Sequence, residues 1–373
     1  MTDTPRPAAA LQWFAGLVRP KTFGTLILFV TSKCDARCAH CFYHAELNRP
    51  GDLTFEELTR ISQTAPRFAD LWLSGGEPLL RKDLAAVVAA FVRNNGVRTL
   101  NLPVNGLHPD RTERFVDQVL AEHPGLFVHC NVSLDGLAAT HDRLRGVAGN
   151  FAKAAATFEA LGRCKARWGR RLWKNANTVI TADNAAEIPA LAAHVWENFG
   201  CDGHYFNVIR GDPKDPGQKA VPGAELRRLH RLIADYEARY AARMFDDRHR
   251  LLRWFKRAAY AGTLAFHHRT QAANHPGPGD GWPMPCTAGE TILVIEHDGG
   301  VRACELRDRI GNLRDHGCDF AAMWADRART DEVAAIAADR CFCSHVCFIH
   351  DSLRHSPRAV FAEIPLAWLN GPG

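Results

Sequence analysis

Strand-like and helix-like segments alternate along this chain from about residue 25 to residue 210. The candidate strands are 26–30, 71–73, 99–104, 126–132, 174–180 and 204–209. Between them, apolar residues recur at helical spacing in 54–64, 83–94, 111–122, 150–163 and 187–199. Such alternation builds a parallel sheet with helices packed outside it. Six units predict an α/β fold, a partial (β/α)6 TIM-like barrel, because a closed barrel needs eight.

Polar and glycine-rich segments follow the candidate strands at their carboxyl ends. They are the loop 34–41, Ser74–Pro78, Asn105 and Gly106, Ser133–Asp135, and Asn207 with Arg210. In sheets of this kind, the chemistry sits where the carboxyl ends of the strands emerge. We therefore expect these segments to meet at one rim of the barrel.

The loop after the first strand carries three cysteines at C-x3-C-x2-C spacing, Cys34, Cys38 and Cys41. Three thiolates within eight residues can bind one iron–sulfur cube, and the fourth iron of the cube then stays open. Structural metal sites usually close the shell with four ligands. The spacing therefore indicates chemistry. A zinc site, completed by His40, His44 or a distant residue, stays open as the alternative.

Size and composition limit the classes of protein to consider. The chain has 373 residues, 46% of them hydrophobic, which is enough for one large domain and an appendage. No apolar run approaches the ~20 residues of a membrane-spanning helix, and the first residues lack a signal-peptide pattern. The net charge of +5 is modest. We expect a soluble, cytoplasmic protein without a nucleic-acid or membrane partner.

The twelve cysteines are unevenly placed. Besides the first three, five lie late in the chain: Cys286, Cys304, Cys341, Cys343 and Cys347. Clustered cysteines in a reducing compartment indicate metal ligands. The segment between Cys286 and Cys304 predicts a β-hairpin that turns at Asp298–Gly300 and brings these two cysteines together.

The combination of motifs resembles the radical S-adenosylmethionine (SAM) superfamily over about residues 25–350. The matching segments are the cysteine loop, Gly75-Gly76-Glu77-Pro78, Val132–Gly136, His141–Gly146 and Thr178–Asn184. The late cysteines resemble the Twitch/SPASM extension of one branch of that superfamily. The resemblance thus implies a partial barrel followed by a C-terminal cysteine-rich Twitch/SPASM-like auxiliary-cluster domain.

The resemblance implies a cofactor set and roles for single residues. Cys34, Cys38 and Cys41 would bind a [4Fe–4S] cluster whose open iron binds SAM. Reductive cleavage of SAM would give a 5′-deoxyadenosyl radical that abstracts hydrogen from a substrate. The SAM pocket would comprise Gly75, Gly76, Glu77, Asn105, Ser133, Asp135, Arg145 and His40. In it, Glu77 would accept from the SAM ammonium, and the ring of His40 would lie against the adenine.

Plainer interpretations of the same residues stay open. Gly75-Gly76 and Asp135-Gly136 can be turns without a role in binding, and Arg145 can be a surface residue.

Of the late cysteines, we favour Cys286, Cys304, Cys343 and Cys347 as ligands of a second, auxiliary [4Fe–4S] cluster, with Cys341 as the rival. His345 and His350 are less favoured ligands, and a zinc site is again the alternative.

The expected organisation has five parts. They are an N-terminal extension 1–24, the radical SAM partial barrel 25–215, a helical segment and linker 216–280, the auxiliary-cluster domain 281–352 and a C-terminal extension 353–373. Within the third part, 224–268 predicts one long or broken amphipathic helix, and 272–285 reads as a linker.

The expected function is a radical SAM enzyme that oxidises, dehydrogenates or cross-links a small molecule or peptide with the help of the auxiliary cluster. A flavodoxin or ferredoxin would supply electrons. The short segment before the barrel leaves no room for an added recognition domain, which favours a small molecule. The alternatives are a ribosomal-peptide or protein maturase that works with a separate recognition partner and, from another class, a non-catalytic metal-binding scaffold.

Overall fold

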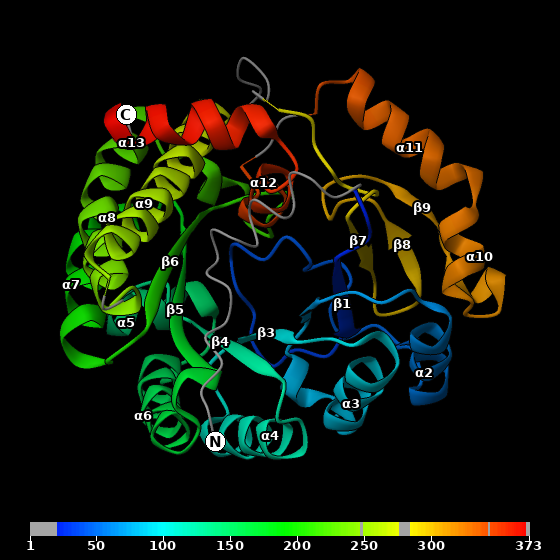
Figure 1. The fold of residues 1–373 in the computed structure, drawn as a ribbon. Helices are drawn as coiled ribbons and strands as arrows, with labels where there is room; N and C mark the ends of the chain where they lie inside the picture. Colours follow the sequence, from blue (N-terminus) through cyan, green and yellow to red (C-terminus); the bar gives the residue numbers. More distant parts are fainter. Residues whose placement is uncertain (1–20, 247–248, 276–283, 342–343, 371–373) are drawn as a thin grey trace.

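The computed structural model describes residues 21–246, 249–275, 284–341 and 344–370. One nine-stranded sheet runs through the described part, in the order β6-β5-β4-β3-β2-β1-β7-β8-β9. The six strands of the first part pair in parallel, each with its neighbour in sequence. The curved sheet with helices outside it confirms the predicted α/β partial barrel (Figure 1).

The six parallel strands lie close to their predicted positions. They are β1 Thr25–Thr31, β2 Asp70–Gly75, β3 Thr99–Val104, β4 Phe127–Ser133, β5 Leu172–Ile180 and β6 Gly203–Val208. The helices between them are α2 Phe55–Thr64, α3 Leu84–Asn95, α4 Pro109–Glu122, α5 Ala138–Arg145, α6 Asn150–Trp168 and α7 Ile188–Asn198. Helix α5 was not expected, because its eight residues carry little apolar periodicity.

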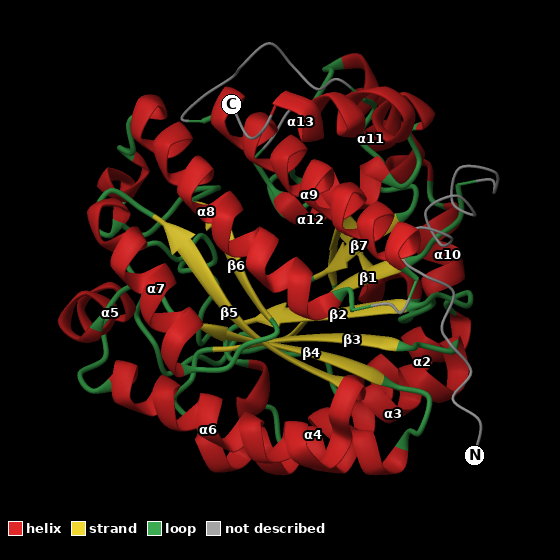
Figure 2. Ribbon diagram, turned by 60° about the vertical axis from the view of Figure 1, so that its left-hand side comes forward, coloured by secondary structure: helices red, strands yellow, loops and turns green. Residues whose placement is uncertain are grey.

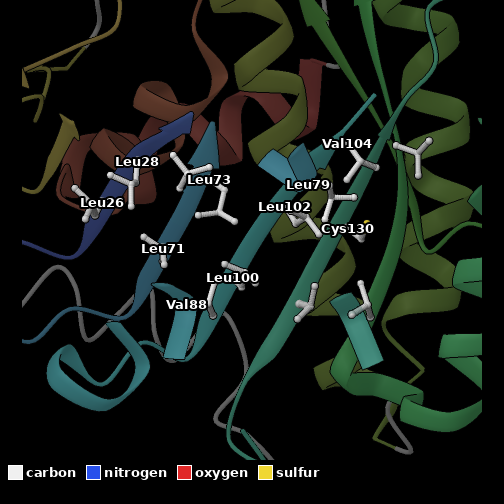
Figure 3. Packing of buried hydrophobic residues seen from close by; sticks show 14 of the residues in the cluster. Leu26, Leu28, Leu71, Leu73, Leu79, Val88, Leu100, Leu102, Val104 and Cys130 are labelled. Carbon is white, nitrogen blue, oxygen red and sulfur yellow. The ribbon is translucent and has the colours of Figure 1, made fainter. Parts of the chain in front are cut away.

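The main core lies between the convex face of the sheet and these helices. Alternate strand residues such as Leu26, Leu71 and Leu100 are fully buried there (Figure 3). Successive side chains of a strand point to opposite faces. The residues between them therefore face the inside of the barrel.

That inner face carries a row of asparagines. Asn131 of β4 donates to Asn101 of β3 (2.5 Å), and Asn175 of β5 donates to Asn131 (3.1 Å). Nearer the carboxyl edge, Asn207 of β6 donates to Asn177 of β5 (2.6 Å). The asparagines therefore make the inside of the barrel polar without adding charge along these four strands.

The C-terminal part extends the same sheet. Strand β7 (Ile292–Ile295) pairs in parallel with β1, and β8 (Gly300–Arg302) and β9 (Arg309–Asn312) follow antiparallel. The hairpin predicted between Cys286 and Cys304 is thereby confirmed. Helices α10 (Phe320–Ala325), α11 (Arg327–Ala338) and α12 (Val346–Leu353) complete this part. The expected domain boundaries stay a prediction.

Two long helices follow β6, which confirms the expected broken helix. They are α8 Gly223–Met244 and α9 Arg250–Ala273, and the last helix, α13 (Ile364–Asn370), lies beside α9 (Figure 2). Of the segment 272–285 that we expected as a linker, residues 276–283 lie outside the described residues.

No helix in the described ranges is both long enough and apolar enough to span a bilayer.

At the carboxyl edge, the loop after β1 and the loop after β2 touch backbone to backbone. Gly76 donates to the carbonyl of Thr31 (2.8 Å), and Glu77 donates to that of Lys33 (2.7 Å). A Cβ on Gly75, whose φ is +113°, would lie 2.4 Å from the Thr31 oxygen. A Cβ on Gly76 would lie 2.1 Å from the Lys33 oxygen. Both glycines are thus required by the close approach of the two loops.

We predict that Gly76→Ala destabilises the fold by about 3 kcal/mol, because backbone atoms must move to admit the methyl group. The measurement is the shift of the urea unfolding transition. Gly125→Ala is the matched control, since no other atom lies within 4 Å of the position of its Cβ, and a change within about 0.5 kcal/mol is expected there. Equal transitions for the two variants would contradict the argument.

Candidate functional site

The three early cysteines lie together on one loop at the carboxyl edge of the sheet. Cys38 is buried, Cys34 and Cys41 are half-buried, and all three are free thiols. Burial raises the pKa of Cys34 to about 12 and that of Cys41 to about 11. Metal binding requires the thiolate form and supplies the positive charge that stabilises it.

Backbone hydrogen bonds from two neighbouring segments fix this loop. Arg37 donates to the carbonyl of Arg145 and Ala39 to that of Leu144, both at 2.9 Å, so the loop caps the end of α5. On the other side, Asp215 donates to the carbonyl of Ala39 at 2.8 Å. The loop is therefore held in shape by the protein chain alone.

The side chain of Asn48 closes the start of the loop. Its amide oxygen accepts from the backbone of Cys34 (3.0 Å), and its amide nitrogen donates to the carbonyl of Cys34 (3.1 Å). Asn48 adopts a left-handed backbone (φ 60°), which asparagine tolerates better than most residues. The sequence did not point to Asn48, because nothing in its spacing relates it to the cysteines.

A buried carboxylate, Asp135, lies behind the cysteine loop. It forms an ion pair with Arg145 (Nε to Oδ2, 2.6 Å) and approaches His40 (Nε2 to Oδ2, 3.4 Å). Its other oxygen accepts from the backbone of Val179 (2.8 Å). Burial opposes ionisation of Asp135, but the charge of Arg145 outweighs it and keeps the pKa below its usual value.

Arg145 reaches from this ion pair to the cysteines. Its Nη1 lies 3.6 Å from the Sγ of Cys38 and donates to it. Although burial works against its charge, Asp135 raises the pKa of Arg145, which therefore stays charged. Arg145 is buried at the site, so the alternative of a plain surface residue is wrong.

His40 presents an unsatisfied polar atom at the same place. Burial lowers its pKa to about 4, so the imidazole is neutral at pH 7. Its Nδ1 is buried and has no hydrogen-bond partner among the described residues. Buried polar atoms are normally paired. The atom is therefore available to a bound ligand, and the site fits a cofactor in this respect.

Glu77 makes different contacts from those expected. Its two carboxylate oxygens accept from the backbone of Asn105 (2.7 Å) and of Leu79 (3.1 Å), and it is buried. Burial raises its pKa to about 7. Glu77 thus ties the end of β2 to the end of β3. The expected contact with the SAM ammonium stays a prediction.

The remaining predicted pocket residues line the same edge. Asn105 donates from its side chain to Asp35 (2.7 Å), a residue inside the cysteine loop that was not singled out from the sequence. His108 also contacts Asp35 (2.6 Å). Ser133 is half-buried at the end of β4, opposite Asn177 of β5. The structure therefore brings every predicted pocket residue to one rim, as the order of strands and loops indicated.

The sulfurs of the three early cysteines are not all close to one another. Within the described ranges, only Glu113, Asp117 and Cys164 place three potential ligand atoms within 4.8 Å of one another. At least one pair of sulfurs in the early trio is therefore farther apart than that. A tetrahedral zinc with Zn–S of about 2.3 Å needs sulfurs about 3.8 Å apart. The described trio is thus wider than a bound zinc ion requires.

The group Glu113, Asp117 and Cys164 is not itself a credible metal site. Arg167 forms ion pairs with both carboxylates (2.9 and 2.5 Å), and Arg163 pairs with Glu113 (2.5 Å). These guanidinium groups already neutralise the charges that would attract a cation.

Three of the late cysteines surround a cavity of about 250 Å³. Cys286, Cys304 and Cys341 line it together with Arg307 and Phe348. Cys347 packs in the same apolar cluster, and Cys343 lies outside the described residues. The cavity favours Cys341, the rival, as a ligand beside Cys286 and Cys304. The identity of the four ligands stays a prediction.

A buried ionic group links the two cysteine regions. Glu305, next to Cys304, pairs with Arg210 at the end of β6 (3.0 Å) and with His345 (2.7 Å). The guanidinium of Arg210 lies 4.9 Å from the ring centre of Phe42, which directly follows Cys41. Burial lowers the pKa of His345, so its neutral ring is a hydrogen-bond partner of Glu305 here, and His350 contacts Arg354 (3.0 Å). In the sequence, Glu305 directly follows Cys304, and this position could have marked Glu305 as a candidate site residue.

Comparison with known proteins relates the barrel part of the chain to a family. The model of the Radical SAM superfamily matches residues 28–168. Among curated proteins, the pre-heme d1 synthase of Dinoroseobacter shibae is 29% identical over 212 residues, 55% of this chain and 49% of the relative. The GTP 3′,8-cyclase of Caulobacter vibrioides is 34% identical over 181 residues, 46% of this chain and 48% of the relative. The chain thus spans about half the length of these relatives.

Two solved structures share the fold at low sequence identity. One is native anSMEcpe with bound AdoMet and the Cp18Cys peptide, with a TM-score of 0.58, 16% identity and coverage of 93% of this chain and 94% of that one. The other is Streptococcus suis SuiB bound to the precursor peptide SuiA, with a TM-score of 0.53, 18% identity and coverage of 82% and 65%. By the family model, residues 28–168 form a Radical SAM superfamily domain, which carries Cys34, Cys38 and Cys41 at the rim of the partial barrel.

Proposed function

We propose that this radical SAM enzyme binds a [4Fe–4S] cluster through Cys34, Cys38 and Cys41 and SAM at the open iron, and that it oxidises, dehydrogenates or cross-links a peptide or small molecule. The observation that carries this proposal is the loop itself, which gathers three thiols at C-x3-C-x2-C spacing at one rim of the barrel. When bound, the cluster and SAM supply the reductive cleavage of SAM that starts radical chemistry.

The residues behind the loop support this assignment by their charge. Arg145 places a fixed positive charge 3.6 Å from the Cys38 sulfur, and Asp135 holds that charge in position. A cluster with thiolate ligands is anionic, and a nearby cation stabilises it. Since Asp135 is already paired with Arg145, we assign it a positioning role toward the cluster.

The free Nδ1 of His40 is our candidate for a direct contact with SAM. If Nε2 donates toward Asp135, then Nδ1 is an acceptor. The amino group of an adenine or of a methionine is a suitable donor. We place Gly75, Gly76, Glu77, Asn105 and Ser133 at the walls of this pocket.

We further propose that the late cysteines bind the auxiliary [4Fe–4S] cluster, with Cys286, Cys304 and Cys341 lining its cavity. The fourth ligand is then Cys347 or Cys343. A cluster with four protein ligands can accept an electron from a substrate, which suits a net two-electron oxidation. The Arg210–Glu305–His345 group connects this site with the cysteine loop. A flavodoxin or ferredoxin is the proposed electron donor.

The inner face of the barrel indicates the kind of substrate. Asn101, Asn131 and Asn177 offer neutral amide groups to the interior. Such groups suit the uncharged donors and acceptors of a peptide backbone. The solved structures that share this fold include two peptide complexes, whereas the curated relatives are named for small-molecule synthesis. We therefore favour a peptide substrate over the small molecule that the sequence favoured.

The first prediction from the proposed function concerns the metal content of the protein. After anaerobic reconstitution with iron and sulfide, we expect about eight irons per chain, two cubes of four. The triple variant Cys34→Ala, Cys38→Ala, Cys41→Ala should retain about four irons and lose the release of 5′-deoxyadenosine from SAM with dithionite. Iron assays and chromatography of the nucleoside measure both.

The matched control is the quintuple alanine variant of Cys286, Cys304, Cys341, Cys343 and Cys347. It should also retain about four irons, but still cleave SAM. Zinc in place of iron, with no SAM cleavage by the intact chain, would refute the enzymatic proposal and favour a scaffold.

The second prediction concerns the link between the two sites. Arg210→Gln removes the cation beside Glu305 and His345, so the auxiliary cluster should become harder to reduce, with its iron content unchanged. Redox titration followed by electron paramagnetic resonance measures this potential. Arg243→Gln is the control, because Arg243 packs on Trp196 (3.5 Å to the ring centre), a residue of the outer helix α7. An unchanged potential for Arg210→Gln would rule out the electrostatic role.

A further inference from the structure

Most of the exposed large apolar side chains in the described ranges gather in one place. Four lie in the first two turns of α9 and four lie near the C-terminus: Leu251, Leu252, Trp254, Phe255, Phe361, Leu366, Trp368 and Leu369. Leu251 is 84% exposed, Leu369 70% and Trp254 57%. We call these eight residues the α9–α13 patch. Contiguous exposed apolar surface of this kind marks an interaction site.

The two parts of the patch form one continuous surface. The rings of Trp254 and Trp368 meet edge to face, with their centres 5.7 Å apart. A Cβ on Gly262 of α9 would lie 2.7 Å from the backbone oxygen of Ile364, so α13 rests directly on α9. Figures 1 and 2 show both helices on the same side of the molecule, next to α8.

The first turns of α9 expose their apolar face to solvent, whereas an ordinary surface helix buries its apolar face. Leu251, Trp254 and Phe255 share one face by their i, i+3, i+4 spacing, and this apolar face is exposed. By contrast, Arg257 is half-buried and donates to the carbonyls of Ala242 (2.8 Å) and Phe245 (3.2 Å). These bonds to the end of α8 keep the apolar face turned outward.

The patch lies in a basic environment. Helix α9 contains five arginine or lysine residues and no aspartate or glutamate, and four of the five fall within its first eight positions. Among the described residues nearby, the acidic groups are Asp246, which pairs with Arg253 (3.7 Å), and Glu363, which pairs with Arg358 (3.0 Å). The described rim of the patch therefore carries more basic than acidic side chains.

This charge distinguishes between possible occupants. A symmetric dimer through the patch would bring α9 or α13 of two copies together and place like charges side by side, which is unfavourable. An anionic lipid surface complements the charge. Tryptophan prefers the bilayer interface, where leucine and phenylalanine tips reach the acyl boundary. The exposed apolar side chains project from two helices. A bilayer surface can take up such projecting side chains, whereas a partner protein would need a matching groove to receive them.

We propose that the α9–α13 patch docks the protein on the surface of a bilayer that contains anionic lipids. The sequence-based expectation of no membrane partner rested on the absence of a spanning segment, and peripheral docking needs none. Docking of this kind is independent of the proposed reaction. It would bring the barrel to substrates that are themselves at the membrane.

The test is sedimentation of the full-length holoenzyme with lipid vesicles. We expect binding to vesicles of equal parts phosphatidylcholine and phosphatidylglycerol, weak or no binding to phosphatidylcholine alone, and loss of binding at about 1 M salt. The variant Leu251→Ser, Trp254→Ser, Trp368→Ser should lower the partition coefficient about tenfold or more. Arg250→Glu with Lys256→Glu should do the same by charge.

Arg327→Glu on α11 is the control for a change of charge elsewhere, since its side chain is 90% exposed and lies on another helix. It should bind like the unaltered protein. Circular dichroism and iron content should be unchanged in all variants. Absence of binding to anionic vesicles, equal binding to neutral vesicles, or a dimer in light scattering that the serine variant dissociates would each overturn the proposal.

Discussion

The buried carboxylate of Asp135 is the contact on which the arrangement of the site depends. It lies at the end of β4, accepts from the backbone of β5, and neutralises Arg145 on α5, whose guanidinium reaches Cys38. A buried charge is tolerated only when it is paired, and removal of one partner costs about 3–5 kcal/mol. The same pair therefore fixes two strands, one helix and one thiol. Together with the backbone hydrogen bonds of Arg37 and Ala39 to α5, this pair positions the cysteine loop.

The rest of the rim is built from backbone contacts that leave little freedom. The glycines after β2 admit the carbonyls of Thr31 and Lys33, and the last turn of α5 accepts from the loop. A preformed loop lowers the cost of assembling a cluster, because the ligands are already ordered. On the far side, Arg210 and Glu305 connect this loop with the second group of cysteines. The two groups thus lie on one continuous sheet, and the contact of Arg210 with Phe42 and its ion pair with Glu305 connect them.

The sequence predicted the fold well wherever a single local pattern decides the structure. The six parallel strands and the hairpin turning at Asp298–Gly300 follow from apolar periodicity and turn residues, and the C-x3-C-x2-C spacing predicted a cluster at the rim that these strands form. Contacts between distant segments were not predictable. Arg210 and Glu305 are 95 positions apart, and the partners of Glu77 depend on how the ends of β2 and β3 meet. The short helix α5 was missed because so few of its residues are apolar.

The most direct test of the account is electron–nuclear double resonance on the reduced holoenzyme with SAM labelled at its amino nitrogen and carboxylate oxygen. If the loop of Cys34, Cys38 and Cys41 leaves one iron open, both labels should show hyperfine coupling to the cluster. A reduced cluster that shows no coupling to bound, labelled SAM, and coupling instead to a nitrogen of a protein side chain such as His40, would contradict the central claim.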